Sequence, residues 1–231
     1  MEQPVQKILR TLIGQGSERN RKGMARFGIE VGQAYGVPVP VIRKLAKEIG
    51  KNHALALALW KTKNHEAQLL ATMIDDPKQV TRAQMNSWVK DFDSWDVCDQ
   101  ACMNLFDRTP FAFAQAEVWS KRKQEFVRRA GFALMAALAF HDKQTPDSEF
   151  QALIKIIERT ATDERNFVRK AVNWALRQIG KRNLKLNASA IQLSRKLSQS
   201  ANKTARWIGA DALRELTSQG VQARLRKKSK Q

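Results

Sequence analysis

The apolar residues of this chain recur every three or four positions over most of its length. This spacing is typical of amphipathic helices, and it is clearest over residues 42–49, 55–60 and 69–74. Proline occurs at only six positions, and the alternating runs that mark β-strands are missing. The sequence therefore predicts an all-α protein of about a dozen helices joined by short loops, with helix ends near Pro77 and Pro110. Asp147, Thr162 and Asn187 are candidate helix N-caps.

A weak internal repeat narrows the fold class. The segment Phe126–Ala130 matches Phe167–Ala171 at an offset of 41 residues, and Ala175–Arg177 matches Ala212–Arg214 at an offset of 37. Periods near 40 residues in a helical chain indicate HEAT- or armadillo-type repeats, which stack into a curved α-solenoid with a concave face. We expect one domain over residues 1–223. Residues 224–231, with five basic side chains in eight, are expected to form a frayed basic C-terminal tail.

The charge balance points to a polyanionic partner. Lysine and arginine total 41 against 22 aspartate and glutamate, a formal net charge of +19. Such an excess favours nucleic acid, with an acidic membrane surface as the other polyanion. Residues 65–117 depart from this pattern, because they carry 9 acidic and 4 basic side chains. This acidic island suits either an active site that stabilises a cation or an ordinary solvated face, and counts alone leave both readings open.

Several classes of protein are excluded or disfavoured. No apolar run approaches the ~20 residues of a membrane span, and the first ten residues show no secretory signal. With only two cysteines, we expect a reducing, cytoplasmic setting. We also expect a monomer. The sequence has no phosphate-binding glycine loop, dinucleotide fingerprint or serine nucleophile elbow. The histidines are far apart, and Cys98 and Cys102 suit a helix core, so we expect no metal and no cofactor.

One carboxylate lies in a setting that suits chemistry on a cation. Trp95 and Asp99 are four residues apart, so they share a helix face on which an indole ring and a negative charge can both attract a positive group. The alternative is a core tryptophan beside an ion-paired aspartate. Arg129 is the expected ion-pair partner of Asp99. Arg128 and Arg129 point in directions ~100° apart on a helix, so only one of them can face a given groove.

A second aromatic residue has a basic neighbour at helical spacing. Arg177 follows Trp174 by three residues, which suits a sugar or base at the ring and a phosphate at the guanidinium. The alternative is a buried tryptophan with Arg177 at the rim. The other four tryptophans lack such neighbours and are expected to pack in the core: Trp60, Trp88, Trp119 and Trp207.

Together these segments resemble the AlkD-like DNA alkylation repair family of HEAT-repeat DNA glycosylases. The resemblance covers nearly the whole chain. Its most specific parts are Ser94-Trp95-Asp96-x-x-Asp99, Val127-x-Arg129-Ala130 and Phe167-Val168-x-Lys170-Ala171-x-x-Trp174-x-Leu176-Arg177. It also includes the segments 24–27 and 36–40 with Arg43, and the helix around residues 65–68.

The resemblance implies a role for individual residues. Asp99 matches the catalytic carboxylate, and Trp95 and Trp174 match the aromatic residues that flank the deoxyribose of the damaged nucleotide. Arg129 matches the arginine that orients the carboxylate. Four further residues are expected to contact DNA: Arg177, Phe27, Lys170 and Arg43. Phe27 stands where related enzymes can carry a tyrosine, so a hydroxyl contact is lost there.

The implied activity is hydrolysis of the glycosidic bond of cationic N3- or N7-alkylated purines in double-stranded DNA, which is gripped mainly through its phosphates. Such a base leaves without being protonated, which fits a site with one carboxylate and no second acid. An oxocarbenium-like transition state would be stabilised by Asp99. Two other classes remain: a non-catalytic HEAT-repeat module that binds a DNA or RNA backbone, and a protein-binding scaffold, which the high positive charge disfavours.

Overall fold

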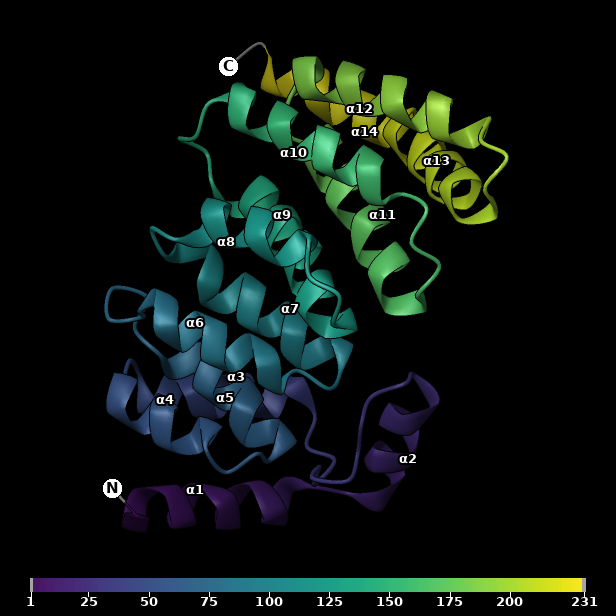
Figure 1. Cartoon of the computed structure of the whole chain (residues 1–231). Helices are drawn as coiled ribbons and strands as arrows, with labels where there is room; N and C mark the ends of the chain where they lie inside the picture. The colour runs from purple at the N-terminus through teal and green to yellow at the C-terminus, as the bar shows by residue number, and fades with distance from the viewer. Residues whose placement is uncertain (1, 230–231) are drawn as a thin grey trace. The chain divides into compact units, whose positions relative to one another are not determined.

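The computed structural model describes residues 2–229, and these residues form fourteen α-helices and two short 3-10 helices with no β-strand (Figure 1). The predicted all-α class is thus confirmed. The predicted helix ends at the prolines are also confirmed, because one helix ends at Ile74 and a 3-10 helix ends at Arg108. The chain divides into two compact units, up to Phe111 and from Ala112 onward.

The first unit is built around one helix, α5 (His65–Ile74), in which nine of ten residues are buried. Helices α3 (Val39–Ile49), α4 (His53–Trp60) and α7 (Trp95–Asn104) all pack against it. Trp60 and Trp88 stack in parallel with ring centroids 3.9 Å apart, and Phe92 packs edge-on against Trp60. The remaining elements of this unit are α1 (Glu2–Gln15), α2 (Glu18–Arg26), α6 (Arg82–Trp88), η1 (Val89–Asp91) and η2 (Phe106–Arg108).

The second unit contains the helices that carry the repeat. The matching segments lie at equivalent positions of α9 (Glu125–His141), α11 (Asn166–Gly180) and α13 (Lys203–Leu216), and α11 packs against both of the others. Phe126 and Phe167, the first residues of the matching segments, contact each other with ring centroids 5.3 Å apart. The intervening helices are α8 (Ala112–Ser120), α10 (Asp147–Thr160), α12 (Leu184–Ser198) and α14 (Gln219–Lys228).

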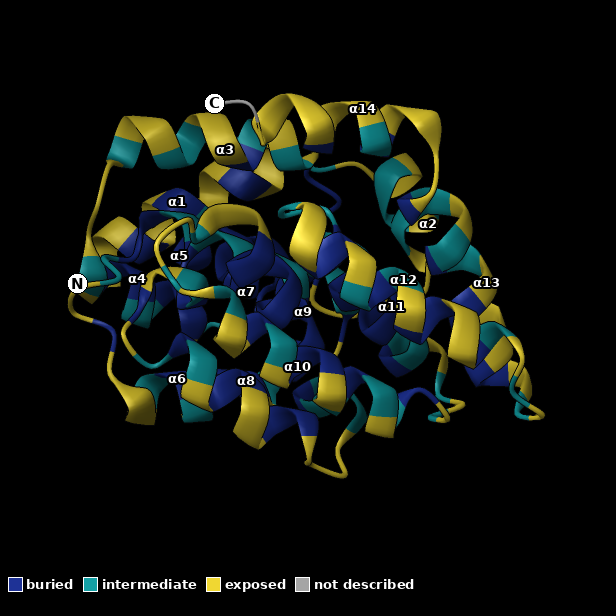
Figure 2. Cartoon of the chain, turned by 90° about the horizontal axis from the view of Figure 1, so that it is seen from above, coloured by how far each residue is buried: buried dark blue, intermediate teal, exposed yellow. Residues whose placement is uncertain are grey.

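Helix α9 forms the centre of the second unit. It is apolar around most of its circumference, as expected for a helix covered on several sides, and most of its length is buried (Figure 2). Gly131 allows α8 to approach closely, because a Cβ atom at this position would lie 2.5 Å from the backbone nitrogen of Ser120. Glycine is therefore required by packing in the middle of this helix, where it would otherwise be unfavourable.

The predicted C-terminal tail and the three predicted N-caps differ from the structure. Asp147 is the first residue of α10, whose N-cap is Pro146. The stretch 224–228 is not a frayed tail: it continues α14, because Leu225 is fully buried, while residues 230–231 lie outside the described residues. Asn187 lies inside α12, where its side chain donates to the Gly180 carbonyl, and the N-cap is Asn183. Thr162 precedes α11, whose N-cap is Arg165. The single domain over residues 1–223 stays a prediction.

Replacing Gly131 with alanine tests the packing of α8 on α9. We expect Gly131→Ala to lower the free energy of unfolding by about 1–3 kcal/mol, because the added methyl group overpacks the contact. Gly14→Ala in α1 is the matched control, since a Cβ atom there meets nothing within 4 Å. The control should be neutral or slightly stabilising in urea unfolding. If both variants changed the free energy of unfolding equally, the close approach of α8 to α9 would be contradicted.

Candidate nucleic-acid interface

The eight residues proposed from the sequence fall into two groups of four. The first unit carries Phe27, Arg43, Trp95 and Asp99, and the second carries Arg129, Lys170, Trp174 and Arg177. Each group is held by a different set of contacts.

In the first unit, the start of α7 presents the tryptophan and the carboxylate on one helix face. Trp95 is the first residue of α7 and is half-buried, and its indole Nε1 donates to the Phe27 carbonyl oxygen at 3.0 Å. Asp99 lies one turn further along and is also half-buried. Phe27 follows the end of α2 and its side chain is 74% exposed. The structure thus brings Trp95 against the backbone of Phe27, and it leaves the phenyl ring in solvent.

The first turn of α7 is fixed by a histidine that sequence reasoning missed. His65 is buried at the start of α5, and its Nε2 lies 2.9 Å from Asp96 Oδ2. Burial opposes the charged form of His65, but the hydrogen bond and negative charge of Asp96 outweigh it and raise the histidine pKa above its usual value of 6.5. Asp96 therefore ties α7 to α5, which leaves Trp95 and Asp99 on another face of the helix.

A buried glutamate organises the loop before α3. The carboxylate of Glu66 accepts hydrogen bonds from the backbone amides of Tyr35, Gly36 and Val37 at 2.7–3.1 Å, and its side chain is fully buried. Gly36 has a φ of +80°, and a Cβ atom there would lie 2.3 Å from the Ser17 carbonyl oxygen. Only glycine fits both requirements. Glu66 thus holds the chain between α2 and α3 against α5.

The acidic island of residues 65–117 is largely structural. Besides Glu66 and Asp96, the buried Asp75 accepts from His53 and Gln84 at 2.6 Å. Asp91 accepts from the Trp60 indole at 2.8 Å. The solvated-face reading therefore fails for these four carboxylates, because each of them binds donors of its own unit. Near Asp99, the exposed Arg43 donates to Gln100 Oε1 at 3.0 Å.

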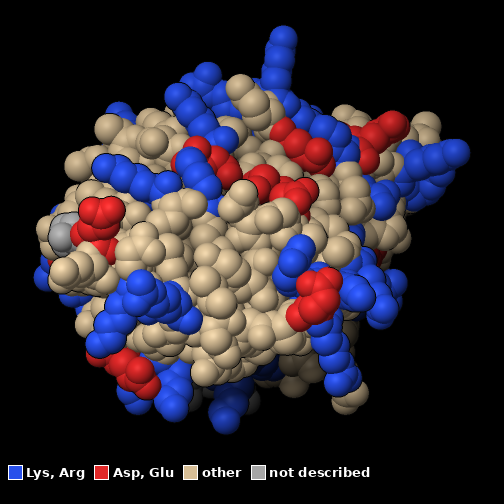
Figure 3. All heavy atoms as spheres, turned by 90° about the horizontal axis from the view of Figure 1, so that it is seen from below, with Lys and Arg blue, Asp and Glu red and all other residues tan. Residues whose placement is uncertain are grey.

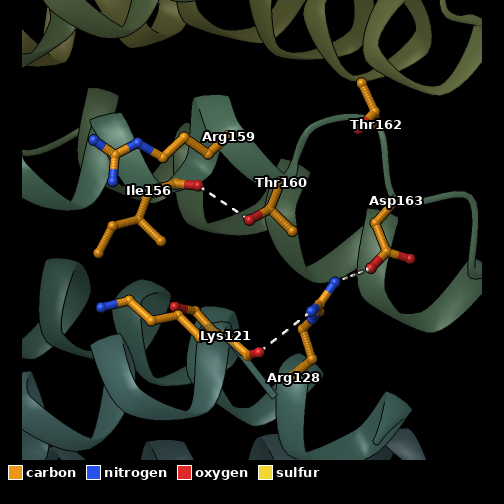
Figure 4. Close-up of a pocket in the computed structure, with 8 residues that line it drawn as sticks. Lys121, Arg128, Ile156, Arg159, Thr160, Thr162 and Asp163 are labelled. Carbon is orange, nitrogen blue, oxygen red and sulfur yellow. Dashed lines mark hydrogen bonds and ion pairs between the residues drawn. The ribbon is translucent and has the colours of Figure 1, made fainter. Parts of the chain in front are cut away.

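In the second unit, the two adjacent arginines of α9 take different partners, as expected. Arg129 is 5% exposed, and its Nη1 donates to the Phe167 carbonyl oxygen at 2.7 Å. Arg128 turns to Asp163 at 2.9 Å and to the Lys121 carbonyl oxygen at 3.4 Å (Figure 4). Its Nε also donates to the Arg122 carbonyl oxygen at 2.6 Å. Asp163 also binds Arg165. These hydrogen bonds and charges outweigh the effect of burial and lower the pKa of Asp163 to about 2.

Trp174 and Arg177 share a face of α11, and both are half-buried. The Arg177 guanidinium is not free: it forms an ion pair with Glu215 and lies 3.9 Å from Asp211, both on α13. Glu215 also binds Lys181 at 2.6 Å. Lys170, on the same helix, is exposed. A phosphate contact by Arg177 therefore requires that its ion pair with Glu215 be exchanged or shared.

The remaining aromatic and sulfur residues divide differently from the sequence expectation. Trp60, Trp88 and Trp119 are at most 3% exposed, which confirms their place in the core. The same prediction is wrong for Trp207, which is 39% exposed, because its position on α13 lies at the surface and Arg169 covers its ring. Cys98 and Cys102 are buried, as expected. Among residues 2–229, no group of three potential ligands could hold a metal ion.

Exposed basic side chains lie among many neutral residues on the surface (Figure 3). On the face drawn in Figure 3, lysine and arginine side chains project at many points, with acidic groups between them. A pocket of about 490 Å³ at the C-terminal ends of α9, α11 and α14 is lined by five cations and no carboxylate: Lys143, Lys181, Arg182, Arg224 and Lys228. No helix within the described residues is long and apolar enough to cross a membrane.

The fold and these surface features define a basic protein of HEAT-like helical repeats. A family model described as DNA alkylation repair enzyme matches residues 8–216. The chain therefore belongs to the DNA alkylation repair enzyme family, as its resemblance to that family predicted.

Two comparisons add to this identification. The chain is 21% identical to the uncharacterized protein Lin0241 of Listeria innocua serovar 6a over 168 residues, which is 71% of this chain and 73% of that protein. A solved structure from a new family of proteins related to the HEAT-like repeat DNA glycosylases with affinity for branched DNA structures is similar over 95% of both chains, with a TM-score of 0.79 and 19% identity. This structural likeness supports the HEAT-like fold.

The pair of His65 and Asp96 predicts a pH dependence. Because the pKa of His65 is raised in the folded state, its charged form stabilises the protein fully below about pH 6.5, and this contribution is lost as the pH rises through the folded-state value. Asp96→Asn should lower the pKa of His65 and flatten this dependence, measured by NMR titration and by melting at several pH values. Asp76→Asn is the control, since Asp76 binds Lys78 and Gln79 instead. An unchanged His65 pKa in Asp96→Asn would contradict the assignment.

Proposed function

We propose that this protein is a DNA N-glycosylase that removes cationic N3- or N7-alkylated purines from duplex DNA. The observation that carries the proposal is the pairing of half-buried Trp95 and Asp99 on one face of α7, in a chain of the DNA alkylation repair enzyme family. The net charge of +19 supports a polyanionic substrate. Asp96, the other carboxylate of the motif, is bound to His65, which leaves Asp99 as the candidate and fits a base that already carries its positive charge.

The chemistry requires little beyond electrostatic stabilisation. The bond between C1′ and N9 of the purine breaks, and its electron pair neutralises the positive charge of the alkylated base. The sugar becomes oxocarbenium-like, and water adds to C1′ and loses a proton. Asp99 stabilises the positive charge on the sugar and positions the water. Trp95 and Trp174 contact the deoxyribose and add π stabilisation, and Arg129 orients the carboxylate.

The other candidate residues serve DNA binding in this proposal. Arg43 and Lys170 are exposed and suited to backbone phosphates. Phe27 supplies an exposed ring near the DNA, while its carbonyl oxygen positions Trp95. Arg177 contributes to phosphate binding only as part of its cluster with Glu215. We therefore expect Arg177→Ala to lower the affinity for DNA less than Lys170→Ala does.

Asp99→Asn tests the catalytic assignment. We expect it to lower the single-turnover rate of 7-methylguanine release from duplex DNA by ~100-fold or more, which is the scale of one lost electrostatic stabiliser, while DNA affinity is kept. Asp93→Asn is the matched control, because Asp93 is an exposed carboxylate of the same segment. Release at the wild-type rate by Asp99→Asn would show that another group does the chemistry.

A second candidate function is binding of DNA without base excision. It is favoured by the structural neighbour from a family with affinity for branched DNA structures, which is similar to this chain over 95% of its length. In that case the protein should bind a four-way junction at least ~10-fold more tightly than a linear duplex of the same length. Binding should weaken steeply with salt as phosphate contacts are lost. Equal affinity for both DNAs, together with base release, would favour the glycosylase.

A further inference from the structure

The repeat identifies one row of equivalent positions along three consecutive helices. The offsets of 41 and 37 residues align Arg129 of α9 with Lys170 of α11 and with Trp207 of α13. Helix α11 packs against both α9 and α13, so the row crosses neighbouring helices of one unit. Two members of this row are cations and the third is a tryptophan. The position on α13 therefore differs in chemistry from its two equivalents.

Trp207 differs from the tryptophans that fill the core. Its side chain is 39% exposed, whereas the three core tryptophans are at most 3% exposed. The Arg169 guanidinium carbon lies 5.2 Å from the centroid of its ring, within the range of a cation–π interaction. Arg169 in turn donates to Asn166 Oδ1 at 3.1 Å, which fixes the guanidinium at the start of α11. The indole is thus held at the surface by a positioned cation.

The surroundings of Trp207 are basic. Lys203 lies four residues before it on α13 and shares its helix face, and Arg206 adjoins it; both are exposed. Lys170 is exposed at the equivalent position of α11. The nearest carboxylate on the same face is Asp211, and it is occupied by Asn173 at 2.7 Å and by Arg214. The Arg206 guanidinium donates to the carbonyl oxygens of Ser200 and Ala201 and binds no carboxylate in these contacts, so the surface around the indole is positively charged.

We infer that Trp207 and Arg169 form a stacking site for an unpaired nucleotide of DNA, with Lys170, Lys203 and Arg206 receiving the adjoining phosphates. An aromatic ring within a basic surface is how proteins hold single-stranded nucleic acid, because every base has a face that can stack. A paired duplex offers only its phosphates and groove edges, for which lysines alone would suffice. This inference rests on the proposed DNA binding but not on base excision.

The test compares a blunt 20-base-pair duplex with the same duplex carrying a four-thymine single-stranded 3′ extension. The wild type should bind the extended DNA more tightly. Trp207→Ala should lose about 5- to 100-fold of affinity for the extended DNA, as expected for one lost base stack, and little for the blunt duplex. Trp207→Phe should keep most of the preference. Phe140→Ala is the matched control, because Phe140 is also exposed and has Lys143 over its ring at 5.8 Å.

The outcomes separate this inference from the proposed function. A wild type that binds both DNAs equally, or a Trp207→Ala variant that loses the same affinity for both, would overturn the stacking site while leaving DNA binding intact. Absence of binding to either DNA would contradict the proposed function and the inference with it. If Phe140→Ala lost the preference for the extended DNA, the single-stranded extension would be bound at a surface other than that of Trp207. Circular dichroism melting confirms that each variant is folded.

Discussion

The candidate site of the first unit depends on one buried charge. Glu66 has no exposed surface, and its side-chain oxygens accept hydrogen bonds from three consecutive backbone amides. A buried carboxylate without such partners would be strongly unfavourable. The loop before α3 must therefore keep the conformation that presents these amides, and Gly36 is the residue that permits it. The same loop follows Phe27, whose carbonyl oxygen receives the Trp95 indole.

In the second unit, ion pairs with a shared aspartate link consecutive repeats. Asp163, in the turn before α11, binds arginines from two consecutive repeats, and these arginines reach the carbonyl groups of the segment before α9. The arginine side chains therefore donate hydrogen bonds to backbone carbonyl groups at helix ends, which have no partner within the helix. The arrangement directs Arg128 toward this network and leaves Arg129 with a separate role. The two adjacent arginines thus make separate contacts within the second unit.

Much of the fold could be predicted from the sequence, because helical periodicity and a repeat of about 40 residues are local signals. The pairing of Trp95 with Asp99 on one face followed from their spacing alone. The contacts that hold the surrounding elements could not be predicted, because His65 binds Asp96 and Glu66 binds the Gly36 amide across 30 or so residues. Trp207 was wrongly predicted to lie in the core, because the residues around it have the composition of an ordinary amphipathic helix. The repeat does not decide its burial either, because it aligns Trp207 both with the exposed Lys170 and with the buried Arg129.

The central claim is that this chain breaks a glycosidic bond and does not only bind DNA. The most direct measurement is mass spectrometry of the products formed by excess wild-type protein on a duplex with a single N7-methylguanine. The account predicts free 7-methylguanine and an abasic strand in equal amounts, above the spontaneous loss seen without protein. Intact modified DNA, recovered after incubation at a concentration that saturates binding, would contradict it.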